Sequence, residues 1–140
     1  MPFKPAKNIP ALVYLPMSNV SIVKGNALVW SSGYVTNATA DSSTNIVGVA
    51  AQTIDNSGGS AGDYNLPVWP ANADVEFSVD SEGTPSQALV GTVCDLADAN
   101  TVDEDSTGNA PVFLIRSMTA AAGGPVVGTF VENVFGGVPN

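Results

Sequence analysis

The chain has no histidine, one cysteine and only four basic residues, and each shortage excludes a class of function. Without histidine the sequence lacks the commonest general base, the usual imidazole metal ligand and the side chain that titrates near neutral pH. A single cysteine, Cys94, excludes an intrachain disulfide and a zinc site built from paired cysteines. Four basic residues against thirteen acidic ones give a net charge of −9, which argues against nucleic-acid binding because phosphate neutralisation needs clustered Lys and Arg.

Long apolar runs are missing near the N-terminus. The apolar patch at 11–15 lies between Pro10 and Pro16. A secretory signal needs about 7–15 apolar residues and a membrane helix about 20. We therefore expect a protein with no membrane partner that is made in a cytoplasm.

Turn-forming residues are abundant, and they are spread along the chain. There are 14 Gly and 10 Pro in 140 residues, which interrupt any helix of normal length. Between them lie short runs rich in Val, Ile, Thr, Tyr and Phe, typical of strands. We predict an all-β fold, a small barrel or sandwich of short antiparallel strands with long acidic loops, and helix limited to single turns at 97–102 and 118–122. Strands are expected at 11–15, 20–23, 27–31, 34–36, 46–53, 64–69, 75–79, 88–95, 111–117 and 126–135.

Two turns are the sharpest local signals. Ser32-Gly33 precedes Tyr34-Val35, and Lys24-Gly25-Asn26 separates two apolar runs. Both patterns predict tight hairpin connections in which Gly takes a positive φ. The polar stretches 55–63, 80–86 and 103–109 are expected to be surface loops.

Charge is distributed unevenly along the chain. No Lys or Arg occurs in 25–115, whereas every acidic residue except Glu132 falls there. The first sixteen residues contain four prolines, so we predict an extended N-terminal arm at 1–16, followed by a single domain at 17–140. The arm could contact a neighbouring subunit or a partner, or it could be a frayed terminus. Its candidate contact residues are Phe3, Lys4, Lys7 and Ile9.

Candidate catalytic and metal-binding groups have simpler structural interpretations. Asp74 and Glu76 alternate with Val75, Phe77 and Val79, which is typical of the solvent face of a half-buried strand. Cys94 lies in an apolar run and is expected to be a core thiol. The 103–109 loop offers oxygen ligands but lacks the EF-hand pattern. We therefore predict no catalytic residue, no cofactor and no metal site, and hence no enzyme.

Four aromatic residues leave two interpretations open. Trp30, Tyr34, Tyr64 and Trp69 could line a carbohydrate platform, or they could fill a barrel interior or a subunit interface. Pro67 and Pro70 flank Trp69, and proline in a strand indicates an edge or an end. Trp69 is therefore a further candidate for an intermolecular contact.

Three segments together resemble a known family. These are Val-Lys-Gly-Asn-Ala-Leu-Val-Trp at 23–30, Gly-Tyr-Val-Thr-Asn-Ala-Thr-Ala at 33–40, and Ile-Val-Gly-Val-Ala at 46–50. In order and spacing they resemble the head decoration, or cement, proteins of tailed bacteriophages. The similarity covers 20–51 and extends more loosely through 126–131. Asn26 stands where many relatives have Asp.

The resemblance implies a structural role. Such proteins bind the outside of the expanded capsid as homotrimers and clamp the major capsid protein against the pressure of packaged DNA. The expected location is the outer surface of the virion, with assembly in the host cytoplasm. The alternatives are a carbohydrate-binding or adhesion module, and a β-domain of a phage tail or baseplate.

Overall fold

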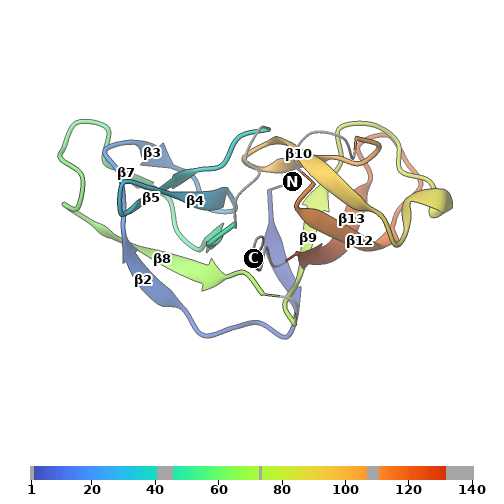
Figure 1. Cartoon of the computed structure of the whole chain (residues 1–140), viewed down its shortest axis with the longest axis horizontal. Helices are drawn as coiled ribbons and strands as arrows, with labels where there is room; N and C mark the ends of the chain where they lie inside the picture. Colours follow the sequence, from blue (N-terminus) through green and yellow to red (C-terminus); the bar gives the residue numbers. More distant parts are fainter. Residues whose placement is uncertain (1, 41–45, 73, 107–110, 132–140) are drawn as a thin grey trace.

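The computed structural model describes residues 2–40, 46–72, 74–106 and 111–131. Within these ranges the chain forms β-strands and one 3-10 turn, η1 (Gln87–Leu89), and no α-helix (Figure 1). The predicted all-β class is therefore confirmed. Both segments expected to form helical turns do otherwise: the chain at 97–103 forms strands joined by a turn, and 118–122 leads into a turn before the last strand. No helix in the described ranges is long and apolar enough to cross a membrane.

In the described ranges the strands form two larger sheets and one small one, and every ladder between neighbouring strands is antiparallel. The six-stranded sheet has the order β1 (Lys4–Lys7), β9 (Glu76–Asp80), β13 (Pro125–Phe130), β12 (Phe113–Met118), β10 (Val93–Asp98) and β11 (Thr101–Asp103). The five-stranded sheet has the order β2 (Val13–Pro16), β8 (Asn65–Pro70), β6 (Gly48–Ala50), β4 (Ala27–Ser31) and β5 (Tyr34–Asn37). The third pairs β3 (Ser21–Ile22) with β7 (Ile54–Asp55).

Each larger sheet curls so that strands distant in its order touch. In the five-stranded sheet, Met17, just after β2, forms a parallel bridge with Val35 of β5. In the six-stranded sheet, Ser81, just after β9, forms a parallel bridge with Val102 of β11. This curvature encloses apolar side chains on the inner faces, as expected for strongly twisted small sheets.

Two clusters of buried apolar side chains hold the strands together. The smaller lies inside the five-stranded sheet and includes Met17, Leu28 and Val35. The larger lies mainly in the six-stranded sheet, but Ala27 and Val49 join it from the five-stranded sheet. Strands β4 and β6 therefore contribute to both clusters and connect the two halves of the molecule that are seen in Figure 1.

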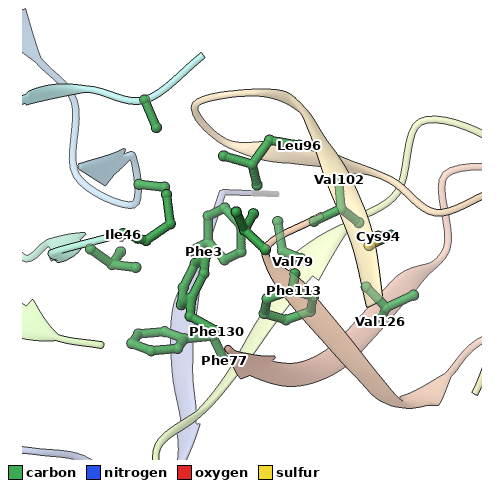
Figure 2. Close-up of a cluster of buried hydrophobic side chains, with 14 of the residues drawn as sticks. Phe3, Ile46, Phe77, Val79, Cys94, Leu96, Val102, Phe113, Val126 and Phe130 are labelled. Carbon is green, nitrogen blue, oxygen red and sulfur yellow. The ribbon is translucent and has the colours of Figure 1, made fainter. Parts of the chain in front are cut away.

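Four phenylalanines form the centre of the larger cluster (Figure 2). The ring of Phe3 has its centroid 5.0 Å from that of Phe130, 5.6 Å from Phe113 and 6.5 Å from Phe77. Four of the five ring contacts among them are edge contacts with interplanar angles from 63° to 88°, a geometry that aromatic pairs prefer. The rings come from the N-terminal segment and strands β9, β12 and β13, so they join ends of the chain that are distant in sequence.

The arm expected at 1–16 is described from residue 2, and it is extended but packs into the sheets of the domain. Phe3 is 1% exposed, β1 pairs with β9, and β2 pairs with β8. Pro5 did not prevent the pairing of β1 because β1 is an edge strand, where a missing N–H need not remove a hydrogen bond between strands. The register of β1 against β9 also shifts between Pro5 and Lys7.

The two predicted hairpin turns have different outcomes. Ser32 and Gly33 have φ values of 52° and 87° and connect the paired strands β4 and β5, so this hairpin is confirmed. Gly25 has a φ of 94° and lies in a turn, but the strands around it do not pair with each other. Its carbonyl accepts a hydrogen bond of 3.0 Å from the N–H of Phe3, so the turn serves to anchor the N-terminus.

Replacing Phe3 by Ala should therefore destabilise the whole fold, by about 3–5 kcal/mol, because it leaves a cavity among the other three rings. Urea unfolding followed by tryptophan fluorescence measures the change. Phe3→Leu is the matched control and should lose less than half as much, since it fills most of the space. A loss below about 1 kcal/mol for Phe3→Ala, the level of an ordinary substitution, would show that the N-terminal segment is not part of the core.

Candidate functional site

The most exposed apolar stretch in the described chain connects β1 to β2. Ile9, Leu12, Val13 and Tyr14 are 67%, 43%, 38% and 63% exposed. The stretch contains no charged residue, in a protein with a net charge of −9. We name residues 9–14 the docking segment; Figure 1 shows it in blue along the lower edge of the view. Contiguous exposed apolar residues of this kind mark sites of interaction with other molecules.

Both ends of the docking segment are fixed. Asn8 precedes it in a left-handed conformation with a φ of 57°, and its side-chain Nδ2 donates a hydrogen bond of 2.8 Å to the carbonyl of Asp74. At the other end, Val13 and Tyr14 belong to β2 and lie opposite Val68 and Pro67 of β8. The segment is therefore presented by two sheets.

Three of the five predicted contact residues are exposed. Lys4 and Lys7 lie on the terminal strand β1, opposite Ser78 and Glu76 of β9, and Ile9 begins the docking segment. The structure thus places two cations immediately before an uncharged apolar surface.

The other two predicted contact residues are positioned differently. Phe3 is buried in the core, so it is not available at the surface of this structure. Trp69 is half-buried and packs against the larger core cluster, with the Nζ of Lys24 5.9 Å from its ring centroid. Trp69 is the second-last residue of β8 and pairs with Val49 of β6, so of the two positions expected from the flanking prolines it occupies a strand end.

Sequence reasoning did not identify Leu12, Val13 and Tyr14 as surface residues. They were expected to form part of a strand, and Val13 and Tyr14 do so. β2 is the first strand in the order of its sheet, and Val13 and Tyr14 stay exposed there while Leu15 packs against the smaller core cluster. The sequence signal that could have indicated exposed apolar residues was the absence of apolar–polar alternation in 11–15.

Exposed aromatic residues mark a second region. Tyr34 and Tyr64 lie near one end of the five-stranded sheet, where Tyr34 contacts Gly62. Trp30 is nearby on β4, paired with Val35. The fourth predicted aromatic, Trp69, is not part of this group, because its ring packs against the larger core cluster.

The predicted acidic loop at 103–109 is described only as far as Ser106; residues 107–109 lie outside the described ranges. Its carboxylates are used in the fold. Oε1 of the buried Glu104 accepts a hydrogen bond of 2.9 Å from the N–H of Gly83, and Oδ2 of Asp95 accepts one of 2.8 Å from the hydroxyl of Ser106. In the ranges that the structure describes, no group of three or more His, Cys, Asp or Glu side chains is placed to hold a metal ion.

Asp103 has an altered acidity. Burial, a hydrogen bond with Asp105 and the nearby charges of Glu82, Asp105 and Glu104 raise the pKa of Asp103 to about 6. All these neighbours are acidic, so proton uptake relieves repulsion among them.

Two further predictions from the sequence are confirmed. Cys94 is buried, and burial raises the pKa of its thiol to about 12, so the thiol stays protonated and unreactive at neutral pH. Val75, Phe77 and Val79 are all buried, whereas Asp74 is exposed and Glu76 is partly exposed. Glu76 therefore lies on the outer face of β9, and Asp74 is exposed in the turn before it.

No family model matches the chain, and no curated protein matches it.

The raised pKa of Asp103 predicts a pH-dependent contribution to stability. Its folded-state pKa of about 6 is above the ordinary value of 3.8, so the folded state holds the proton more tightly. This contribution is fully present below pH 3.8 and is lost as the pH rises through about 6. Asp103→Asn, which keeps a hydrogen-bond donor toward Asp105 but carries no charge, should raise the urea midpoint at pH 7.5 more than at pH 4.

Asp74→Asn is the control, since it removes the same charge from an exposed site away from the acidic loop. Equal effects of Asp103→Asn at both pH values would contradict a raised pKa at that residue.

Proposed function

We propose that this protein is a head decoration protein of a tailed bacteriophage, which binds the outer surface of the expanded capsid and stabilises it. Two independent features support the proposal. The first is the resemblance of residues 20–51 and 126–131 to that family. The second, which carries most weight, is the docking segment, because an exposed apolar surface on an acidic protein fits permanent association with another protein.

The charges around the docking segment suggest what its partner offers. Lys4 and Lys7 lie exposed just before it, while residues 25–115 contain no basic residue. The partner surface is expected to combine an apolar patch with acidic groups near the two lysines. The acidic remainder of the protein would be repelled from such groups, and this orients the protein during encounter.

The expected partners are the major capsid protein and further copies of this chain. A homotrimer at a symmetry axis of the capsid closes its contacts in a ring, so that three docking segments act together. Linked contacts raise the overall affinity well beyond that of one segment. Such a trimer would hold adjacent capsid subunits against the pressure of packaged DNA.

Sedimentation with phage heads tests the proposal directly. The protein is mixed with expanded, undecorated heads or with unexpanded procapsids, and the bound fraction is measured after pelleting. We expect saturable binding to expanded heads and little binding to procapsids. Co-purification with tails and failure to bind any head would favour a tail or baseplate role.

Substitutions in the docking segment should weaken this binding without unfolding the protein. Leu12→Ser/Tyr14→Ser removes exposed apolar surface, and we expect at least a tenfold rise in Kd on heads, equivalent to about 1.4 kcal/mol. The change in urea stability should be within about 0.5 kcal/mol per residue, as is usual for surface positions. Deleting residues 2–9 is a poor test because it also removes Phe3 from the core.

A second double variant, Lys4→Glu/Lys7→Glu, tests the charges beside the docking segment. It should reduce binding to heads most at low salt, because salt screens exposed charges. Arg116→Glu, an exposed reversal on β12, is its control. If both docking variants bind heads as the unmodified protein does across salt concentrations, the docking segment is not the capsid contact.

A further inference from the structure

Trp30 and Tyr64 lie in one row across the end of the five-stranded sheet. Trp30 on β4 is opposite Val35 on β5, and Val35 forms the bridge to Met17. The N–H of Met17 then donates a hydrogen bond of 3.1 Å to the carbonyl of Tyr64. The sheet curls at this bridge. The row therefore runs from Trp30 through Val35 and Met17 to Tyr64, with the two aromatic residues at its ends.

Alternation along β4 places Trp30 on the inner face of the curled sheet, and Tyr64, which directly precedes β8, lies beside Met17 at the same end. Trp30 is two residues from the buried Leu28, and Tyr64 is two residues from the buried Leu66. Val35 and Met17 between them are fully buried, whereas Trp30 and Tyr64 are each 51% exposed. Two half-exposed aromatic side chains therefore flank an apolar floor.

The backbone at this end is firmly held. The N–H of Gly62 donates a hydrogen bond of 2.9 Å to the carbonyl of Met17, which fixes the loop before Tyr64 to the sheet. A Cβ on Gly62 would lie 3.1 Å from the ring of Tyr34, so this ring packs directly on the glycine. The carboxylate of Asp63 accepts a hydrogen bond of 2.9 Å from the N–H of Ser60. Groups held in this way lose little freedom when a ligand binds.

The surroundings of Trp30 and Tyr64 differ from those of the docking segment. The neighbouring exposed residues are small or polar: 31–33 are Ser-Ser-Gly, and 57–63 are Ser-Gly-Gly-Ser-Ala-Gly-Asp. The docking segment instead presents adjacent aliphatic side chains. A protein partner needs a continuous apolar core in its interface, whereas a sugar ring needs an isolated aromatic face with hydrogen-bonding groups beside it.

We propose that this end of the molecule, which we call the aromatic end (Trp30, Tyr64 and Asp63), binds an uncharged sugar ring. The C–H face of a pyranose carries partial positive charge and is attracted to the negative face of an aromatic ring. The carboxylate of Asp63 can accept hydrogen bonds from sugar hydroxyls. Since 25–115 contains no Lys or Arg, an anionic sugar finds no counter-charge on these strands and loops. The ligand class is therefore a neutral glycan, and the activity is surface adhesion.

This inference does not depend on the proposed function, and its test separates the two. The full chain is first screened on an array of neutral and anionic glycans, and the best neutral glycan is then titrated in solution. Trp69→Phe provides a background in which Trp30 is the only tryptophan, so that its fluorescence reports on the aromatic end. We expect saturable, millimolar or tighter binding of a neutral glycan with a change in this fluorescence.

Trp30→Ala and Tyr64→Ala should each weaken glycan binding at least tenfold. Tyr14→Ala is the matched control, because Tyr14 is 63% exposed but lies outside the aromatic end. It should leave glycan binding unchanged. Conversely, Trp30→Ala/Tyr64→Ala should still bind phage heads.

Three outcomes would overturn the inference. The first is that no neutral glycan binds with a dependence on Trp30 and Tyr64. The second is that anionic glycans bind better than neutral ones. The third is that Trp30→Ala/Tyr64→Ala abolishes head binding, which would make the aromatic end a protein-docking surface. The first two results leave the proposed head binding by the docking segment untouched.

Discussion

The structure depends on the burial of Phe3 among three other phenylalanine rings. The ring that fills this space comes from the N-terminal segment, whereas its neighbours Phe77, Phe113 and Phe130 come from strands far along the sequence. The cluster therefore closes the chain on itself. Burying a phenylalanine side chain contributes about 1.5–3 kcal/mol, a large part of the stability of a domain this size.

The position of Phe3 also determines where the docking segment lies. Once Phe3 is buried, β1 is held against β9 in the six-stranded sheet, while β2 pairs with β8 in the five-stranded sheet. The chain must cross from one sheet to the other between them; residues 8–12 make this crossing, and Val13 and Tyr14 begin β2. Since nothing else in the described chain covers the crossing, its apolar side chains stay exposed. The surface thus follows from the way the core recruits the N-terminus.

The strands that could be predicted from the sequence are those in which apolar and polar residues alternate or that are bounded by turn residues. The strand at 27–31, the turn at Ser32-Gly33 and the buried face of β9 were all predicted, because each rests on local backbone preference or on a period of two. Strands β1, β7 and β11 were missed. They are two to four residues long, and β1 reads Lys-Pro-Ala-Lys, with neither alternation nor β-branched residues. Only pairing with β9 makes it a strand, and such pairing is a tertiary property.

The same limit applies to the candidate surfaces. Lys4, Lys7 and Ile9 were recognised from composition, whereas the burial of Phe3 depends on three rings that the sequence places more than seventy residues away. Strand β2 shows how local geometry then separates the two proposed activities. Leu15 packs in the smaller core cluster and Met17 forms the floor of the aromatic end, so Tyr14, between Val13 and Leu15, points to the opposite face. One short strand therefore carries Tyr14 of the docking segment on one face and leads into Met17, beside Trp30 and Tyr64, on the other. The two faces share a backbone but no side chain. A substitution on one face should therefore leave binding at the other face intact, so the two binding activities can be measured separately.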